Sequence, residues 1–256
     1  MQIYVCIKHV PDSAANIHIL DDIRIDEKVA FLLNPYDEHA VTEAASLKQK
    51  VPDSEIIAVC LGKPDAEKTI RSAMAMGADR GILVETDDVC DSMTTARALH
   101  AAIVQDGSAD IIFTGKESID SEGMQTQFRI GALFDFPVVT NAAAFDITSG
   151  KAVVTCELSG GRTRTFHLSL PCVVGAGRGL NTPGYPTFPD VVKARKKSIK
   201  TISMDNLSIT PATGSAKTVA LTPLEQKRYP KKITGNPADQ AKEIIRILRQ
   251  EAKVLT

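Results

Sequence analysis

The stretch ADIIFTGKESIDSEGMQTQFRIGALFDF, Ala109–Phe136, decides the fold. It predicts a buried strand at Asp110–Thr114, a glycine and lysine turn, the polar loop Glu117–Gln125 and then a helix. The apolar side chains that this helix can turn toward a core are Phe128, Ile130, Leu133 and Phe134. A strand that leads through a loop into a helix N-terminus presents free N–H groups and a favourable dipole to an anion such as phosphate. We therefore expect a nucleotide site in this loop.

Strands and helices alternate along the chain as far as this stretch. The expected strands are Met1–Val10, Glu55–Leu61, Arg80–Val84 and Asp110–Thr114, with one more possible at Ile23–Leu32. The expected helices are Asp65–Met76, Asp91–Gln105 and one that starts at the Asn34–Asp37 turn and runs through Lys48. Continuous hydrophobicity indicates strands that are buried on both faces, as in parallel sheets. The alternation predicts an α/β fold built from βαβ units.

The pattern changes after Pro137. Strands of mixed polarity are expected at Val138–Ile147, Lys151–Leu158 and Thr163–Leu170, as antiparallel additions to the sheet edge, followed by the short strand Pro171–Ala176. We place the nucleotide-binding domain at residues 1–176.

No periodic pattern continues beyond Gly177. Residues from Gly177 to about Lys200 are predicted to form a long ordered arm without a core element, and Ile202–Tyr229 to remain irregular. A final helix is predicted from Asn236 or Pro237 to about Lys253. An arm and tail of this length are unusual inside a compact domain, so we expect residues 177–256 to wrap a partner.

Composition describes an ordinary globular protein. The 256 residues are 43% hydrophobic and 24% charged, with a net charge of −1, which argues against a dominant nucleic-acid surface. No apolar run approaches the roughly 20 residues that span a bilayer, and Met1 leads into a strand without the features of a signal peptide. We expect a cytoplasmic protein. Its five cysteines have no CxxC spacing and are expected to be reduced, structural thiols.

Motifs for catalysis are missing from the sequence. Residues 175–179, GAGRG, resemble part of a dinucleotide-binding fingerprint, but the prolines that follow forbid the helix it needs. The turn at Ser159–Gly161 is best explained as a hairpin. The five histidines lack metal-ligand spacing and a visible nucleophile partner. We therefore expect neither catalytic residues nor a metal site.

Ligand-binding loops are expected at the carboxyl ends of the parallel strands, where α/β sheets bind ligands. These loops are Cys6–His9, Asn34–Asp37, Leu61–Gly62 and Gly115–Thr126. Asp120 and Glu122 would repel a phosphate unless backbone N–H groups and Lys116 outweigh them, and both acids can also be explained as helix-capping residues. Spacing alone favours helix capping.

Five segments, in order, resemble the β subunit of electron transfer flavoproteins. They are VCIKHVPD at Val5–Asp12, NPYDEHAVTEA at Asn34–Ala44, AMGADRGILVE at Ala75–Glu85, GKESIDSEGMQT at Gly115–Thr126 and LNTPGYPTFPDVVKARKK at Leu180–Lys197. The resemblance implies an adenine nucleotide alpha hydrolase-like domain and a heterodimer whose α subunit holds most of the redox FAD. It also implies an adenine nucleotide in the β subunit, either AMP or, in electron-bifurcating members, a second FAD.

The resemblance maps the nucleotide pocket onto the strand ends already identified. The implied site residues are Cys6, Lys8, Asn34, Pro35, Tyr36, Asp37, Leu61, Gly115, Lys116, Ser118, Ile119, Asp120, Ser121, Glu122, Gly123, Met124, Gln125 and Thr126.

The arm is implied to contact a partner dehydrogenase through a recognition loop. Its apolar anchor, usually leucine before a proline, is Phe188 here. The other implied recognition residues are Tyr185, Pro189, Lys193, Arg195, Lys196 and Lys197. Residues 181–185 read NTPGY where the family usually has Asn-Glu-Pro-Arg-Tyr, so the choice of partner is open.

Three functions follow as expectations. The first is an electron carrier, not an enzyme by itself, that acts with its α subunit between a dehydrogenase of the acyl-CoA type and a quinone oxidoreductase or other acceptor. The second is an electron-bifurcating subunit whose second FAD accepts hydride from NADH. VPD at Val10–Asp12 and Asp37 resemble the residues of this branch of the family. Gln125 and Thr126 instead resemble the housekeeping carriers. The third is a free-standing nucleotide-binding stress or signalling protein, which leaves the tail without a role.

Overall fold

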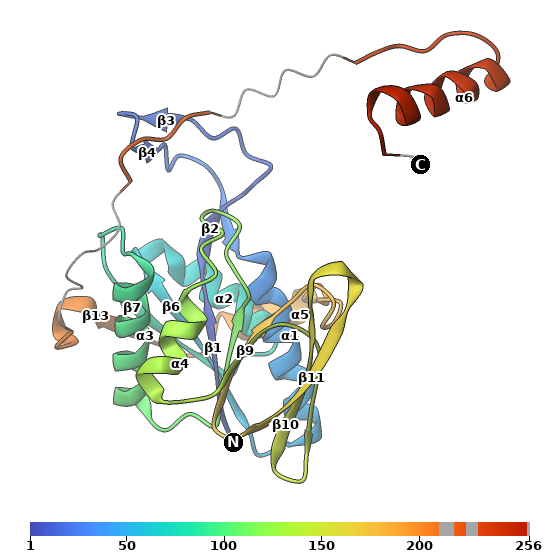
Figure 1. Cartoon of the computed structure of the whole chain (residues 1–256). Coiled ribbons are helices and arrows are strands. Elements are labelled where there is room, and N and C mark those ends of the chain that lie inside the picture. Colours follow the sequence, from blue (N-terminus) through green and yellow to red (C-terminus); the bar gives the residue numbers. More distant parts are fainter. Residues whose placement is uncertain (210–217, 224–229, 255–256) are drawn as a thin grey trace. The chain divides into compact units, whose positions relative to one another are not determined.

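The computed structural model describes residues 1–209, 218–223 and 230–254 (Figure 1). The chain divides into two compact units, Met1–Ala220 and Leu221–Thr256, and each is described by itself. Part of the region Ile202–Tyr229, for which we predicted irregular structure, lies outside the described residues.

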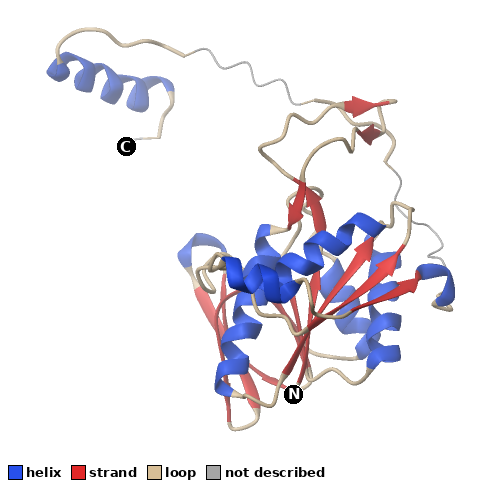
Figure 2. Cartoon of the chain, turned by 180° about the vertical axis from the view of Figure 1, so that it is seen from behind, coloured by secondary structure: helices blue, strands red, loops and turns tan. Residues whose placement is uncertain are grey.

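A nine-stranded sheet forms the centre of the first unit (Figure 2). Its strand order is β11-β10-β9-β12-β8-β1-β6-β7-β13, and neighbours from β9 to β13 run parallel. β10 pairs antiparallel with β9 and β11, which confirms the expected antiparallel addition at this edge. The bounds are β1 (Gln2–Ile7), β6 (Glu55–Gly62), β7 (Arg80–Glu85), β8 (Ile111–Gly115), β9 (Val138–Thr148), β10 (Lys151–Glu157), β11 (Thr163–Ser169), β12 (Cys172–Ala176) and β13 (Ile199–Ser203).

Helices cover both faces of this sheet. Helices α1 (Pro35–Lys50) and α2 (Glu67–Ala75), the latter preceded by a 3-10 turn at Pro64–Ala66, share one apolar core with Ile3, Val5 and Ile7 of β1. Helices α3 (Ser92–Asp106) and α4 (Thr126–Phe134) share the other with Tyr4 and Cys6. Successive side chains of a strand point to opposite faces, so a strand covered on both sides must be apolar throughout. The predicted α/β fold with a parallel sheet is confirmed.

The first strand is shorter than predicted. It ends at Ile7, and β2 (His9–Pro11) leaves the main sheet to pair with β5 (Phe31–Leu33). The break falls at Lys8, whose backbone N–H donates to the side chain of Asp37. The single strand expected at Ile23–Leu32 was also wrong, because this region holds β4 (Arg24–Ile25), which pairs with β3 (Ile19–Leu20), and then β5.

Helix α4 faces the core with fewer residues than predicted. Ile130 is buried, whereas Phe128 and Leu133 are exposed, so the prediction was wrong for these two. Phe134 lies at the core margin, where its ring stacks on Phe136 at 5.0 Å between centroids. A two-turn helix at the side of the sheet buries one narrow stripe, and the rest of its apolar surface stays in solvent.

The arm contributes to the main sheet, contrary to the expectation of no core element. After α5 (Phe188–Ala194), strand β13 pairs parallel with β7 and buries Ile202. The compact unit therefore extends beyond the expected domain boundary at Ala176, as far as Ala220. Short helices and single edge strands lack a long hydrophobic period, which is why the sequence pattern did not reveal them.

Hydrogen bonds of polar side chains connect the arm to helices α1 and α2. Asn181 donates to Glu43 Oε2 at 2.9 Å and to the carbonyl of His39 at 3.0 Å, both on α1. Arg71 of α2 donates to three carbonyls at the end of α5, and Lys197 Nζ donates to the carbonyls of Met74 and Ala78. These bonds satisfy orphan carbonyls at two helix C-termini.

The second unit contains the predicted C-terminal helix. α6 (Pro237–Arg246) starts at the cap Asn236, whose side chain accepts from the N–H of Asp239, and continues into a π-helical turn at Ile247–Glu251. No residue of α6 is buried, and Ile244 and Ile245 are nearly half exposed. Within residues 1–209, 218–223 and 230–254, no helix combines the length and apolar character that crossing a membrane requires. All five cysteines lie in the described part of the chain and are free thiols, four of them buried.

Candidate functional site

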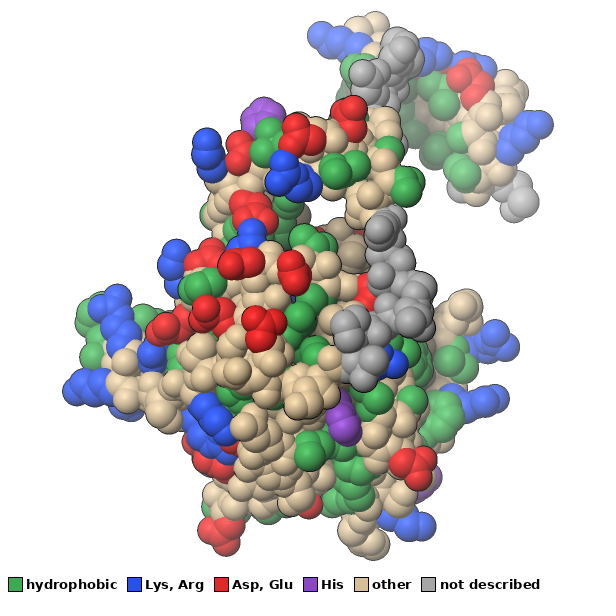
Figure 3. Space-filling model, turned by 90° about the vertical axis from the view of Figure 1, so that its left-hand side faces the viewer, with side chains coloured by type: hydrophobic (Ala, Val, Ile, Leu, Met, Phe, Trp, Pro, Cys, Tyr) green, Lys and Arg blue, Asp and Glu red, His purple; other side chains and the backbone are tan. Residues whose placement is uncertain are grey.

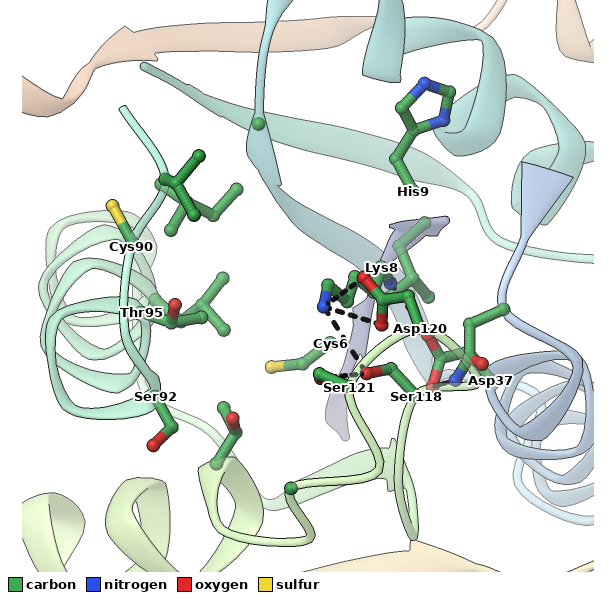
Figure 4. A pocket seen from close by; sticks show the side chains of 18 of the residues that line it. Cys6, Lys8, His9, Asp37, Cys90, Ser92, Thr95, Ser118, Asp120 and Ser121 are labelled. Carbon is green, nitrogen blue, oxygen red and sulfur yellow. Dashed lines mark hydrogen bonds and ion pairs between the residues drawn. The ribbon is translucent and has the colours of Figure 1, made fainter. Parts of the chain in front are cut away.

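A pocket of about 800 Å³ opens where β1, β6, β7 and β8 end at their carboxyl sides (Figure 4). Its walls are the loops that follow these strands, together with the start of α3 and the β4–β5 segment. Ligands of α/β proteins bind at this position because the loops converge there. The pocket confirms that the loops expected to bind a ligand lie together at one edge of the sheet.

The loop between Gly115 and α4 lines this pocket. Glu122 and Met124 adopt the left-handed conformation, with φ of 48° and 51°, which re-aims successive peptide groups. The described residues provide no side-chain cap for α4, and Gly123, Met124, Gln125, Thr126 and Gln127 all line the pocket. The first N–H groups of a helix have no partner within the helix. This part of the pocket is therefore suited to an anion.

Lys8 brings a positive charge to the same place. Its Nζ lies 2.7 Å from a carboxylate oxygen of Asp120 and 3.3 Å from Ser118 Oγ, both in the loop (Figure 4). Burial acts to raise the pKa of Asp120, but the charge and hydrogen bond of Lys8 outweigh it and hold this pKa below its ordinary value. Asp120 is thus the counter-ion of Lys8.

Two buried polar side chains, Asn34 and Asp37, form part of the pocket wall. Asn34, at 1% exposed, occupies the N-cap position of α1 but makes no capping hydrogen bond. Instead its side chain donates to the carbonyl of Glu117 at 2.9 Å and accepts from the N–H of Ile119 at 3.2 Å. Asp37 accepts a 2.9 Å bond from the Asn34 side chain. The turn before α1 therefore holds the start of the loop that follows Gly115.

A second part of the pocket lies on the other side of Lys8 from the loop (Figure 4). The His9 ring stacks on Phe31 with 4.6 Å between centroids, and its nitrogens approach Thr69 Oγ1 at 2.7 Å and Asp65 at 3.3 Å. Lys63 forms an ion pair of 2.5 Å with Glu27. This end is formed by planar rings and paired charges, so it differs chemically from the loop end.

Acidic side chains outnumber basic ones around the pocket. Among the described residues that line it, lysine contributes two, Lys8 and Lys63, and carboxylic side chains contribute seven, namely Glu27, Asp37, Asp65, Asp87, Asp88, Glu117 and Asp120. Acidic side chains also gather on the face seen in Figure 3. An anionic ligand is therefore favoured only where N–H groups and Lys8 outweigh this field.

Most of the predicted nucleotide residues line the pocket. They are Cys6, Lys8, Asn34, Asp37, Leu61, Gly115, Ser118, Asp120, Ser121, Gly123, Met124, Gln125 and Thr126. Five others lie outside the lining, namely Pro35, Tyr36, Lys116, Ile119 and Glu122. Lys116 points to the Tyr36 ring, 5.1 Å from its centroid, and pairs with Glu117 at 3.2 Å. Of the two lysines predicted for the site, Lys8 lines the pocket and Lys116 does not.

The loop after β7 was not among the loops predicted to bind a ligand. Residues 86–90 line the pocket, as do Ser92, Thr95 and Leu99 of α3. The rule that ligands bind at strand carboxyl ends already included this loop, because β7 was a predicted strand. Gln127 was also not predicted. It is buried, and its side chain donates to the carbonyl of Lys116 at 2.8 Å.

The predicted recognition residues fall into two groups. Tyr185 is 99% and Phe188 81% exposed, and Phe188, Pro189 and Lys193 belong to α5, which begins with a capping box between Thr187 and Asp190. Arg195 and Lys196 are also exposed. Lys197 differs because its ammonium is turned toward the end of α2, as described above.

Comparison with known proteins identifies the family. Residues 23–207 match the family model described as the electron transfer flavoprotein domain. The electron transfer flavoprotein subunit beta of Bacillus subtilis is 33% identical over 260 aligned positions, covering 100% of both chains. The mouse subunit is 37% identical over 211 positions, covering 80% of this chain and 82% of its own. The chain belongs to the electron transfer flavoprotein β subunit family. The resemblance of the five segments is thereby confirmed, and electron transport is the role of this family.

We expect Lys8 to dominate the affinity of the pocket for anions. Lys8→Met should weaken the binding of inorganic pyrophosphate to the full chain by about tenfold to a hundredfold, because a charge-assisted hydrogen bond contributes about 1.5–3 kcal/mol. The melting temperature should change little, because the side chain of Lys8 is 44% exposed. Calorimetric titration measures the affinity.

Lys50→Met is the matched control, since Lys50 forms a similar ion pair with Asp146 at 2.9 Å outside the pocket. It should leave the affinity unchanged. Equal affinities of the Lys8 and Lys50 variants would show that Lys8 does not bind the anion.

Proposed function

We propose that this chain is the β subunit of a heterodimer that carries electrons through an FAD held mainly by an α subunit. The partners would be a dehydrogenase of the acyl-CoA type as donor and a quinone oxidoreductase or other acceptor. The observation that supports this proposal most directly is the pocket at the strand ends, with Lys8 and the uncapped α4, in a chain of this family. The cytoplasmic location remains a prediction.

The ligand of the β pocket is proposed to be AMP. Its phosphate would be held by Lys8 and by the N–H groups of residues 123–126, while Cys6, Leu61 and Leu99 offer apolar surface to the base. AMP has no redox chemistry, so its contribution would be to stabilise the loops around it. A ligand that binds only the folded state stabilises it by mass action.

The tail is proposed to wrap the α subunit. α6 is amphipathic in sequence, and in the described helix no residue is buried, although it carries Ile244 and Ile245. An amphipathic helix obtains most of its stability by packing its apolar face against another surface. The α subunit would supply that surface for this part of residues 177–256.

The start of α5 is proposed to contact the dehydrogenase. Phe188 and Tyr185 expose large aromatic side chains, which are typical of anchors at protein interfaces. Lys193, Arg195 and Lys196 would attract an acidic partner and raise the association rate in a salt-dependent way. Lys197 would act structurally, because its ammonium already binds two carbonyls.

A second FAD in the pocket is the alternative, and one observation favours it. A volume of about 800 Å³ is near the upper end of the roughly 300–1,000 Å³ of ligand pockets. The part lined by His9 and Phe31 would have to receive a flavin ring beyond the phosphates. With NADH as donor, this subunit would then be electron-bifurcating.

A free-standing signalling or stress protein would account for the pocket alone. It would leave Phe188 and the apolar face of α6 without a role.

The nucleotide content of the purified complex tests the proposed function. Co-expression with an α subunit should yield a stable heterodimer, and mass spectrometry after denaturation should find one AMP and one FAD per heterodimer. Two FAD would support the bifurcating alternative. A chain that purifies as a monomer, with no affinity for any α subunit, would contradict the proposal.

Phe188→Ala tests the recognition loop. The variant should keep the heterodimer, its FAD and its melting temperature, because the side chain is 81% exposed. Electron transfer with the physiological dehydrogenase should become about thirtyfold less efficient at low substrate concentration, as expected for an anchor that contributes about 2 kcal/mol. Stopped-flow reduction of the flavin measures this rate.

Val104→Ala is the control, because Val104 on α3 is an exposed apolar residue away from α5. Its transfer rate should equal that of the wild type. If Phe188→Ala instead dissociates the heterodimer while the remaining complex transfers electrons normally, Phe188 has a structural role.

A further inference from the structure

Asp37 is a buried carboxylate that accepts hydrogen bonds from three segments of the chain. One oxygen accepts from the N–H of Lys8 at 2.7 Å, and the other accepts from the N–H of Gly115 and the side chain of Asn34, both at 2.9 Å. Only 4% of the residue is exposed. Lys8 follows β1 and Gly115 ends β8, and these strands are neighbours in the sheet. The carboxylate therefore links the two strand ends from which the anion-binding groups project.

The chain around Asp37 is shaped to let this carboxylate approach. A Cβ atom at position 115 would lie 2.4 Å from Asp37 Oδ1 and 2.6 Å from Tyr36 Cβ, which is closer than such contacts allow. Position 115 therefore requires glycine for close approach and not for an unusual φ angle. Its backbone N–H can then reach the carboxylate directly.

We propose that Asp37 is a positioning residue that must be ionised to hold Lys8 and the loop after Gly115 in their nucleotide-binding geometry. This proposal rests on the proposed function. Asp37 acts through other groups, because its oxygens are occupied by Lys8 N, Gly115 N and Asn34 Nδ2. Lys8 would present its ammonium, and the loop its N–H groups, to the phosphate.

The three hydrogen bonds need a carboxylate. All three partners are donors, so a protonated Asp37 would direct its own O–H at an N–H group and lose at least one bond. Burial raises the pKa of Asp37 to about 7, while the hydrogen bonds from Asn34, Lys8 and Gly115 oppose a larger shift. The charge of this side chain therefore changes in the range where the protein can be measured.

Other titratable groups face Asp37 or lie near it. Burial raises the pKa of the thiols of Cys6 on β1 and Cys60 on β6, so both stay neutral near pH 7. Asp120, with a lowered pKa, stays ionised and paired with the ammonium of Lys8. Glu117 is paired with Lys116, and the His9 ring contacts Thr69 and Asp65.

Titration of Asp37 should affect the stability of the fold and the affinity for the nucleotide in opposite directions. Because the pKa of Asp37 is higher in the folded than in the unfolded chain, its protonated form favours folding. That contribution is present below about pH 4 and is lost as the pH rises through about 7. Nucleotide binding needs the ionised form, so affinity should instead rise with pH over the same range. General loosening of the fold cannot produce this combination.

The test is equilibrium binding of AMP to the full chain with its α subunit, from pH 6 to pH 8.5. The wild type should bind about tenfold more weakly at pH 6 than at pH 8, since one proton must leave Asp37 on binding. Asp37→Asn should bind about tenfold more weakly at pH 8, because its amide NH₂ would face the N–H of Lys8. Titration of the AMP phosphate affects the wild type and Asp37→Asn equally, so it cancels in the ratio of their affinities at each pH. This ratio should approach one at pH 6.

Asp79→Asn is the matched control. Asp79 also accepts from a strand N–H, that of Ile56 at 2.7 Å, and from Lys48 Nζ at 2.6 Å, but it lies outside the pocket lining. This variant should lose stability yet keep the AMP affinity and pH profile of the wild type. If Asp37→Asn does not fold, adenosine 5′-methylphosphate, whose phosphate does not titrate here, gives the wild-type profile alone.

A wild-type affinity for that ester that is flat between pH 6 and 8 would overturn the proposal. So would an Asp37→Asn variant with wild-type affinity and profile, or equal losses of affinity in the Asp37 and Asp79 variants. Failure of every form to bind AMP or FAD at any pH is a different result. It would remove the proposed function, and this inference with it.

Discussion

The carboxylate of Asp37 is the point on which the pocket depends. It accepts the N–H groups of Lys8 and Gly115, at the ends of two neighbouring parallel strands, and the side chain of Asn34. At Lys8 this bond takes the N–H away from the ladder, so that β1 ends and β2 turns to pair with β5. At Gly115 it marks the point where the sheet gives way to the nucleotide loop. One buried side chain thus connects the two strand ends between which we propose that an anion binds.

Charge around the pocket works against an anion except in one small region. Carboxylic side chains outnumber lysines in the pocket wall, and one of them, Asp120, is paired with Lys8. A phosphate would compete with Asp120 for the same ammonium, while the N–H groups before α4 remain available to it. An anionic ligand would therefore be selected by the placement of a few donors and not by a general positive field.

The sequence predicted the sheet and the position of the site better than its details. Continuous apolar runs such as Glu55–Leu61 identified parallel strands, and their carboxyl ends predicted where the loops meet. The resemblance of five segments to the β subunits then identified the family, which the pattern of strands and helices alone does not specify. Lys116 was expected to help outweigh the acidic side chains of the loop at a phosphate, but its side chain lies over the Tyr36 ring, an orientation that no local sequence pattern encodes. β13 was missed because a single edge strand after a proline-rich arm has no repeating pattern, although it pairs with β7 over five residues.

A crystal structure of the heterodimer with its nucleotide would test the central claim most directly. We predict phosphate oxygens within hydrogen-bond distance of Lys8 Nζ and of N–H groups in residues 123–126. The Asp37 carboxylate should still accept from Lys8 N and Gly115 N and should not touch the nucleotide. A phosphate bound at the His9 and Lys63 end, or an Asp37 side chain turned to contact the nucleotide, would contradict this account.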